Sequence, residues 1–410
     1  MSRDNSGKST LAFIMFCQLM CGLATTLNTA LIPCLKELLQ ISLAKALQIQ
    51  IAFYLGYSAA PFAGKLLKAL QYRKSLFIAL IGTSVGCLIV YPAAGFANFS
   101  LFLFAVFVLG ANISLLQVST SSLTLDIGDP KYSSSRIVLV MSFYAMGTAI
   151  GPMLGAAVFL GSNEALATIY NPSILQTPYT ILALSWLLLA GLSYKISLPH
   201  FKTENKKDRL RIKEPLWTNF RLMISALILI TYVGVEVCLG TLGIPFLTEE
   251  QAGAYSLETA GTLMGLYWGG MMLGRMLGSW SLKHISEETF LPLLSLTATI
   301  LIILAIVIPG PVSGGCLIAT GLCLSILFPT IFAIGCRQVK YRRQEAAGIL
   351  YMGNFGGAIL PWIQGTLADQ TSLQWSFLLP ALATFTVFLY TLWIFRAEKK
   401  TQTLQVIGDL

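Results

Sequence analysis

Residues 200–215 read HFKTENKKDRLRIKEP, and this hydrophilic stretch divides a 410-residue chain that is apolar over most of its length. A helix needs about 20 mostly apolar residues to cross a bilayer. Candidate segments precede and follow the stretch in equal number, near residues 11–35, 45–67, 75–96, 99–124, 136–161, 176–197, 218–246, 257–281, 289–309, 313–336, 346–368 and 374–396. The sequence therefore predicts an all-α membrane protein with 12 transmembrane helices in two pseudo-symmetric six-helix bundles. These are residues 1–199 and residues 216–410 with a short tail, joined by a linker at 200–215.

The composition excludes a water-soluble protein. Hydrophobic residues make up 55% of the chain and charged residues 11%, whereas a soluble domain carries about 25% charged residues. A net charge of +9 without dense basic clusters also excludes nucleic-acid binding. The eight cysteines lie in or at the ends of apolar segments, so no disulfide framework is expected.

The basic residues predict the orientation of the helices. With twelve spans, only Lys36 and Lys45 of the 27 lysines and arginines fall on one face, so the other 25, Arg275 among them, lie on the face that also holds both termini. Cytoplasmic segments of membrane proteins are rich in lysine and arginine. A missed span would invert every later loop, so this asymmetry predicts twelve spans with cytoplasmic termini.

A weak internal repeat indicates two equivalent halves. A shift of 214 residues aligns Phe53-Tyr54 with Tyr267-Trp268, Gly56 with Gly270, and Gly64 with Gly278. Small residues every four positions let membrane helices approach closely. A chance match between two glycine-rich helices remains an alternative reading.

One carboxylate falls well inside a predicted span. Glu236, in YVGVEVCLG at 232–240, lies 15 residues beyond Arg221, or about 22 Å along a helix. Ionisable groups in the bilayer are costly and mark functional sites. Because desolvation favours the neutral carboxylic acid, Glu236 could bind and release a proton, or help to hold Na⁺. The alternative is a static hydrogen bond between helices.

Uncharged polar side chains in the spans are candidates for binding a substrate. Amides and hydroxyls both donate and accept hydrogen bonds, which suits a ligand rich in hydroxyl groups. Aromatic rings could stack on a sugar ring. The predicted substrate-binding residues are Thr25, Asn28, Thr29, Gln117, Ser121, Tyr144, Trp268 and Asn354. Bonding between helices is the alternative role of each.

No enzymatic or metal site is predicted. Gly7-Lys8-Ser9-Thr10 lacks the upstream glycine of a phosphate-binding loop. Cys17, Met20 and Cys21 have helical spacing, but both histidines lie in predicted loops, so a soft-metal site is disfavoured. We expect no catalytic residue and no cofactor other than the coupling ion, H⁺ or Na⁺. The expected partners are a small-molecule substrate and the lipid bilayer, with the protein a monomer.

The chain resembles the major facilitator superfamily, and specific strings resemble its fucose and glucose–galactose transporter branch. They include LNTALIPCLKELL (27–39), AFYLGYSAAPFAGKLLKALQYRK (52–74), YVGVEV (232–237), FPTIFAIG (328–335) and MGNFGGAILP (352–361). The resemblance implies an alternating-access carrier of the bacterial inner membrane that imports a hexose with a cation, with one central site between the halves.

The resemblance also bears on individual residues. Thr29 and Gln117 occupy the places of an Asp and a Glu in the fucose–proton symporters. Gln117, Glu236 and Asn28 instead resemble the glucose–galactose subgroup. Lys68 replaces the usual acidic residue of the loop signature that begins at Gly64.

Several residues are assigned to helix packing and gating, namely Gly64, Gly151, Pro152, Gly274, Arg275, Gly356 and Gly357. Among them, Gly151-Pro152 also resembles the glycine–proline motif of proton-coupled drug antiporters. Export of drugs or metabolites is therefore the alternative function, with a uniporter as a further alternative.

Overall fold

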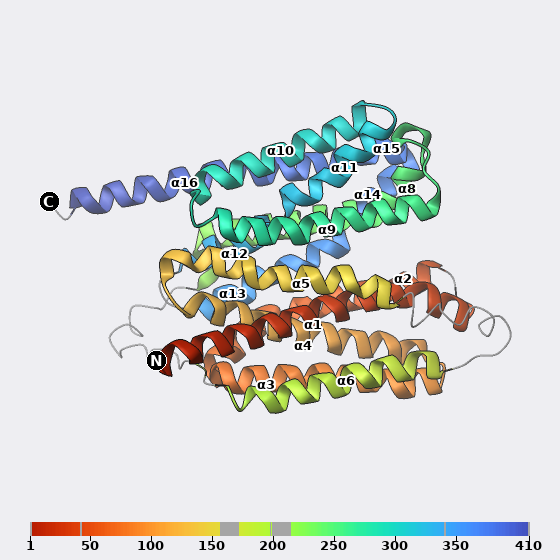
Figure 1. The fold of residues 1–410 in the computed structure, drawn as a ribbon, viewed down its shortest axis with the longest axis horizontal. Helices are drawn as coiled ribbons and strands as arrows, with labels where there is room; N and C mark the ends of the chain where they lie inside the picture. Colours follow the sequence, from red (N-terminus) through yellow and green to blue (C-terminus); the bar gives the residue numbers. More distant parts are fainter. Residues whose placement is uncertain are drawn as a thin grey trace.

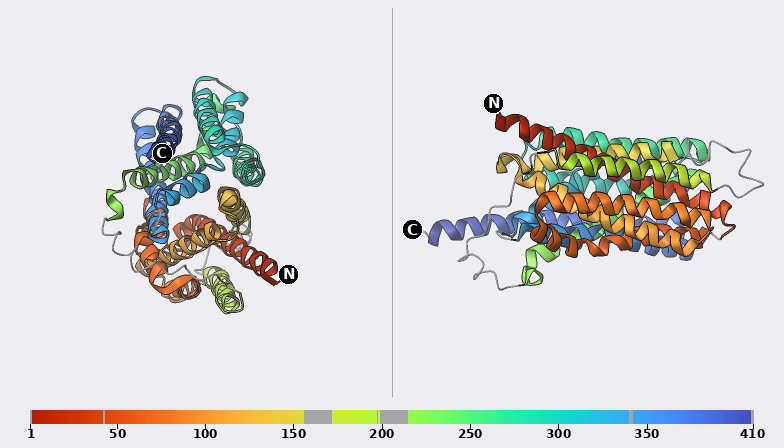
Figure 2. Two further views of the ribbon diagram at one scale, coloured as in Figure 1. Left: turned by 90° about the vertical axis from the view of Figure 1, so that its left-hand side faces the viewer. Right: turned by 90° about the horizontal axis from the view of Figure 1, so that it is seen from below.

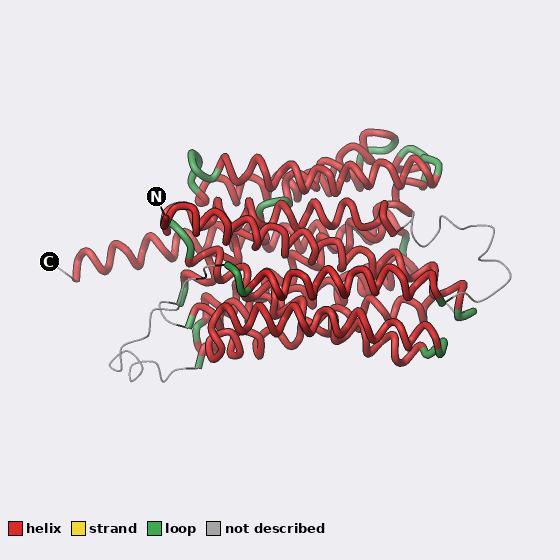
Figure 3. Tube along the Cα trace, turned by 60° about the horizontal axis from the view of Figure 1, so that its bottom comes forward, coloured by secondary structure: helices red, strands yellow, loops and turns green. Residues whose placement is uncertain are grey.

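The structure, a computed structural model, describes residues 2–41, 43–155, 172–196, 198, 215–339 and 342–408. Every regular element in these ranges is a helix, drawn in red in Figure 3. The expected linker at 200–215 lies outside the described residues except for Pro215.

The part of the chain before the linker forms six α-helices and two short 3₁₀ turns. They are α1 (Ser2–Leu38), α2 (Leu43–Gly56), η1 (Tyr57–Ala59), α3 (Ala60–Gly95), α4 (Phe99–Asp126), η2 (Pro130–Tyr132), α5 (Ser133–Gly155) and α6 (Ser173–Ser193). We call these the N-terminal group.

The part after the linker is interrupted more often. Its elements are η4 (Leu216–Thr218), α8 (Phe220–Thr248), η5 (Glu250–Ala252), α9 (Leu257–Ser281), α10 (Glu287–Val307), α11 (Pro311–Leu324), α12 (Leu327–Arg337), α13 (Arg343–Tyr351), η6 (Met352–Phe355), α14 (Gly356–Gln370), α15 (Leu373–Ser376) and α16 (Leu378–Gly408). We call these the C-terminal group.

Within the described residues, ten segments are long and apolar enough to cross a membrane, judged by length and composition. One of them, Gln48–Gly95, has 48 residues, which is about 72 Å of helix against a hydrocarbon layer about 30 Å thick. Inside it, Gln71 has φ 65° and ψ 170°, so the helix is not continuous there. The glycine-rich helix α9 is not among the ten, although it has 25 residues.

The helices lie side by side, and the two groups occupy opposite sides of the molecule (Figure 1). Helices α5, α9, α12 and α13 lie where the groups meet, and α5 contacts both α9 and α12. The first turn of α1 and the last turn of α16 lie at the same end of the helices (Figure 2). We call this the terminal end.

Close helix crossings depend on glycine. In α5, a Cβ on Gly147 would lie 2.1 Å from the Leu19 carbonyl oxygen of α1, and one on Gly151 would lie 1.9 Å from Thr26 Oγ1. Gly151 therefore lies at a helix contact, whereas the side chain of Pro152 is outside the described part. Cβ atoms in real structures do not come so close, so α1 and α5 are in contact only because these positions lack side chains.

This crossing generates a stability prediction. Gly147→Ala should force α1 and α5 apart, and overpacking of this kind costs about 1–3 kcal/mol. We expect a lower thermal unfolding midpoint for the purified protein. The matched control is Gly191→Ala in α6, where an added Cβ meets no atom within 4 Å. Equal midpoints for the two variants would contradict the described crossing.

Candidate functional site

Glu236 lies in α8, midway between the residues that begin and end this helix. Its side chain is 16% exposed, and one carboxylate oxygen lies 3.9 Å from Nη2 of Arg275 in α9. A partly exposed carboxylate at this depth indicates a polar space beside it, because a lipid-facing charge would be too costly.

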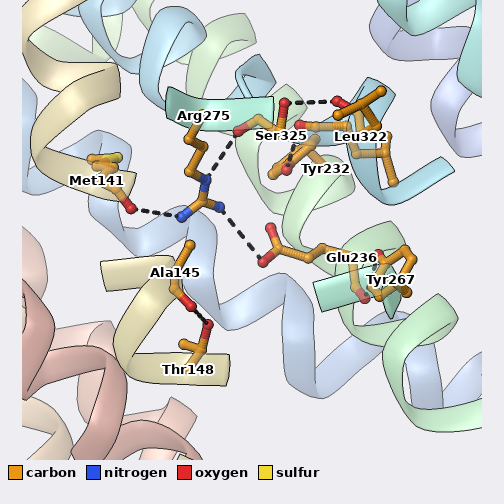
Figure 4. Close-up of polar contacts among 10 residues, drawn as sticks. Met141, Ala145, Thr148, Tyr232, Glu236, Tyr267, Arg275, Leu322 and Ser325 are labelled. Atoms are coloured by element: carbon orange, nitrogen blue, oxygen red, sulfur yellow. Dashed lines mark hydrogen bonds and ion pairs between the residues drawn. The ribbon is translucent and has the colours of Figure 1, made fainter. Parts of the chain in front are cut away.

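The charge count assigned Arg275 to the face that holds the termini, and the structure shows in addition that its side chain is buried. Its side chain is 5% exposed, and Figure 4 shows it directed into the interior toward Glu236. Nε donates to the Ser325 carbonyl at 3.0 Å, and Nη1 donates to the Met141 carbonyl of α5 at 3.1 Å. Counting charges along the sequence could not detect this burial, because burial depends on which face of α9 the residue occupies.

A helix break supplies the acceptors for this arrangement. Ser325 lies in the two-residue interruption between α11 and α12, where backbone carbonyls lose their helical partners. In a membrane such groups need other donors. Arg275 satisfies Ser325, and the Tyr232 hydroxyl donates to the Leu324 carbonyl at 2.9 Å. The break therefore connects α8, α9, α11 and α12 through polar contacts.

Glycines bring α9 against this break. A Cβ on Gly274 would lie 2.4 Å from Ser325 Oγ, and one on Gly278 would lie 2.2 Å from Ile326 Cγ2. These two glycines belong to the repeated small-residue stripe. Gly274 adjoins Arg275, so the close approach allows the guanidinium to reach the Ser325 carbonyl.

Tyrosines from both groups lie within electrostatic range of Glu236. Tyr232 of α8 and Tyr267 of α9 interact electrostatically with its carboxylate, as do Tyr54 of α2 and Tyr144 of α5. The Tyr267 hydroxyl also lies 3.5 Å from the Glu236 carbonyl. The carboxylate thus faces the boundary between the N-terminal and C-terminal groups.

The predicted polar cluster of α4 is buried and already bonded. Gln117 Oε1 accepts a hydrogen bond from the Tyr57 hydroxyl at 2.9 Å, which fixes the orientation of its amide. Ser121 Oγ lies 2.6 Å from the Tyr351 hydroxyl of α13, across the boundary between the groups. The sequence pattern identified Gln117 and Ser121 but gave no signal for Tyr351.

The predicted residues of α1 are only partly described. Thr25 donates to the Cys21 carbonyl at 2.8 Å and interacts with the Tyr144 side chain. Asn28 and Thr29 belong to the helix, but their side chains lie outside the described part. The structure therefore brings Thr25 and Tyr144 together and leaves the positions of the other two side chains as predictions.

Trp268 and Asn354 are half-buried in the C-terminal group. The Trp268 ring packs edge-on to Tyr267, with centroids 5.1 Å apart. Asn354 lies in η6, between α13 and α14, and donates to the Tyr351 carbonyl at 3.1 Å.

The two predicted glycines that follow Asn354 lie at close contacts. A Cβ on Gly356 would lie 1.8 Å from the Ile230 carbonyl oxygen, and one on Gly357 would lie 3.2 Å from Tyr54 Cζ in the N-terminal group. Gly357 therefore lies where α14 meets α2.

The two groups are in contact at the terminal end. The Ser135 hydroxyl of α5 donates to the Ser279 carbonyl of α9 at 2.6 Å, and the Ser279 hydroxyl donates to the Ser135 carbonyl at 2.9 Å. Lys68 forms an ion pair with Glu345 of α13 at 3.0 Å. A Cβ on Gly64 would lie 2.5 Å from the Gln344 carbonyl oxygen. These contacts join the two groups at this end.

Metal-binding side chains do not gather in the described ranges, where no group of three His, Cys, Asp or Glu residues could hold a metal ion. Cys17 and Cys21 are both buried in α1.

Comparison with known proteins identifies the fold. The model of the Major Facilitator Superfamily matches residues 14–353 and 315–406. The chain belongs to the major facilitator superfamily. This confirms the resemblance seen in the sequence. Together with bacterial relatives and the apolar helices, it identifies an integral protein of the bacterial inner membrane.

Among curated relatives, a "Glucose/galactose transporter" of Brucella abortus (strain 2308) is 30% identical over 384 residues, covering 93% of this chain and 92% of the relative. An "L-fucose-proton symporter" of Escherichia coli (strain K12) is 26% identical over 428 residues, covering 95% and 94%.

Among solved structures, FucP in the outward conformation has a TM-score of 0.83 at 24% identity, covering 95% of this chain and 99% of that one. The proton:xylose symporter XylE has a TM-score of 0.73 at 14% identity, covering 94% and 95%. At these identities both comparisons show a shared fold.

The orientation of Gln117 generates a prediction. Tyr57→Phe removes the hydroxyl that holds the amide, and loss of a buried hydrogen bond typically costs about 1 kcal/mol. We expect a lower thermal unfolding midpoint for the purified protein. As control, Tyr91→Phe alters a half-exposed tyrosine of α3 and should leave the midpoint unchanged. An unchanged Tyr57→Phe midpoint would contradict a structural role for this bond.

Proposed function

We propose that this chain is a proton-coupled symporter that imports a hexose or a related small polar solute by alternating access. The observation that carries the proposal is the carboxylate of Glu236, which lies deep in a helix at the boundary between two groups of helices and is partly exposed. Two relatives support the sugar substrate and the proton coupling, since one is a glucose/galactose transporter and another an L-fucose-proton symporter. Sodium remained open on the sequence alone, but the second relative favours the proton.

The proposed topology has twelve spans and cytoplasmic termini. Dividing Gln48–Gly95 at Gln71 and adding α9 to the ten apolar segments among the described residues gives twelve. The excess of lysine and arginine on the face that holds the termini supports their cytoplasmic location. The proposed domains are residues 1–199 and 216–410, joined by a cytoplasmic linker at 200–215.

In this topology the closed terminal end faces the cytoplasm. Solute would then enter from the opposite side and bind at the boundary between the groups, near Glu236. Gln117 and Asn354 could bond sugar hydroxyls, while Tyr144 and Trp268 offer aromatic faces. Thr25, Asn28, Thr29 and Ser121 complete the proposed binding residues.

Coupling requires that proton and solute cross together. Outside, at neutral pH, Glu236 would take up a proton only when solute binds, and strong acidification would be needed to protonate it without solute. The carrier would then close on the outside and open to the cytoplasm, where both ligands leave. The ion pair with Arg275 supports this role, because it stabilises the ionised carboxylate in the state closed to the cytoplasm.

The proposal predicts the behaviour of Glu236→Gln in proteoliposomes. A glutamine cannot exchange a proton, so uphill accumulation of labelled sugar driven by a pH gradient should be abolished. Exchange of sugar for sugar should persist, because exchange needs no net proton movement. Glu258→Gln, at an exposed position of α9, is the control and should accumulate sugar normally.

Three results would overturn this assignment. Concentrative uptake by Glu236→Gln at the wild-type level would remove the coupling role. Wild-type transport that only equilibrates sugar would indicate a uniporter. Binding of apolar drugs without sugars in a thermal-shift screen would favour the exporter suggested by Gly151-Pro152.

A further inference from the structure

Arg275 links the two groups of helices. Its guanidinium donates to the Met141 carbonyl in the N-terminal group, at 3.1 Å, and to the Ser325 carbonyl in the C-terminal group, at 3.0 Å. Its remaining nitrogen faces Glu236 at 3.9 Å. Figure 4 shows these three contacts spreading from one side chain. Arg275 therefore holds α5 against the helix break while it neutralises the proposed proton-binding group.

The charge of Glu236 affects the stability of this contact. Arginine stays protonated at any accessible pH, and a buried cation needs an anion nearby, because carbonyl dipoles alone compensate it poorly. When Glu236 is ionised, the pair is neutral overall. When Glu236 takes up a proton, the guanidinium is left buried with an uncompensated charge.

Other groups near Glu236 do not change their charge in the same range of pH. Those that interact with it are Arg275 and Tyr267 from α9, Tyr232 from α8, Tyr54 from α2 and Tyr144 from α5. Tyrosine in water titrates at about pH 10. Of these groups, the carboxylate is thus the one whose charge changes below the pH at which tyrosine titrates.

Resting on the proposed function, we propose that Arg275 is a positioning residue that couples the ionisation of Glu236 to closure of the terminal end. Ionised Glu236 holds the guanidinium in place to bind Met141, which keeps α5 against α9. Protonation of Glu236 weakens that hold and favours separation of the two helices. Release of the proton restores it and returns the empty carrier to the closed arrangement.

Other polar contacts also join α5 to the C-terminal group near Arg275. The reciprocal bonds between Ser135 and Ser279 join α5 to α9 further toward the terminal end. Arg337 of α12 donates to Ser134 Oγ at 3.1 Å. The bond between Arg275 and Met141 is thus one of several polar contacts that join α5 to α9 and α12, and it is the one that adjoins Glu236.

The test measures the opening of the terminal end directly. Nitroxide labels on Lys131→Cys and Lys283→Cys, in a background without native cysteines, report the distance between η2 and the end of α9. In lipid nanodiscs without sugar, acidification from pH 8 to pH 5 should shift the unmodified carrier toward longer distances. Coupling between sites typically spans about 5–150-fold, so we expect a population ratio that changes on the order of tenfold.

Variants of the pair identify its role. Arg275→Gln should favour long distances at both pH values and lose the pH-dependent shift. Glu236→Gln should do the same, and the double variant should resemble either single one, because both remove the same interaction. Arg275→Lys keeps the charge and should retain part of the shift.

The matched control is Arg73→Gln. Arg73 also donates to two backbone carbonyls, those of Tyr194 and Ile196, but both belong to the N-terminal group. Its variant should keep the full shift. A pH-dependent shift that survives in Arg275→Gln would overturn the proposal, as would an Arg73→Gln variant that loses it.

This measurement is independent of transport. Because it needs no sugar, a normal distance shift combined with absent sugar uptake would leave the role of Arg275 standing and reject the proposed substrate. Normal proton-coupled sugar uptake with no distance shift in any variant would support the proposed function and reject the role of Arg275. If Arg275→Gln fails to fold, as judged by gel filtration, Glu236→Gln and Arg275→Lys decide the question.

Discussion

A cation buried within a membrane protein must be compensated, and the contacts around Arg275 follow from that requirement. Its donors bind two backbone carbonyls, and Glu236 supplies the opposing charge. One of those carbonyls is available because the helix is interrupted at Ser325. The other belongs to a different group of helices. The buried charge of Arg275 thus connects three features: the helix break at Ser325, the carboxylate of Glu236, and the contact between the two groups at Met141.

Glycine allows this arrangement to form. Gly274 and Gly278 let α9 lie against the break, and in the first half Gly56 lies at a similar crossing with α4 while Gly64 contacts α13. Gly64 and Gly278 are related by the 214-residue repeat, which also pairs Gly56 with Gly270 and Ala60 with Gly274. The two halves therefore use the same small-residue stripe, but only the second half carries the arginine. The proposed coupling device is thus an asymmetric feature of a nearly symmetric fold.

Much of the fold was predictable because hydropathy acts locally. Apolar runs and turns in the sequence marked the helices, and the family strings identified the superfamily, which the family model confirms. Gln117 was found from helical spacing, and Glu236 from its isolation among apolar residues. Arg275 was counted with the basic residues of the terminal end, and nothing in the sequence indicated that its side chain is buried and faces Glu236. Which face it occupies depends on how α9 packs, and no local pattern records that.

By itself, the sequence determined that this is an α-helical membrane protein of a known superfamily, with one acidic residue deep in a span. Membrane insertion depends on the composition of each segment alone, so these properties can be read segment by segment. Only the tertiary structure decided that Glu236 faces Arg275, that Gln117 is held by Tyr57, and that Ser121 meets Tyr351 across the boundary. These are contacts between residues far apart in the chain, and helix crossings fixed by backbone approach determine them.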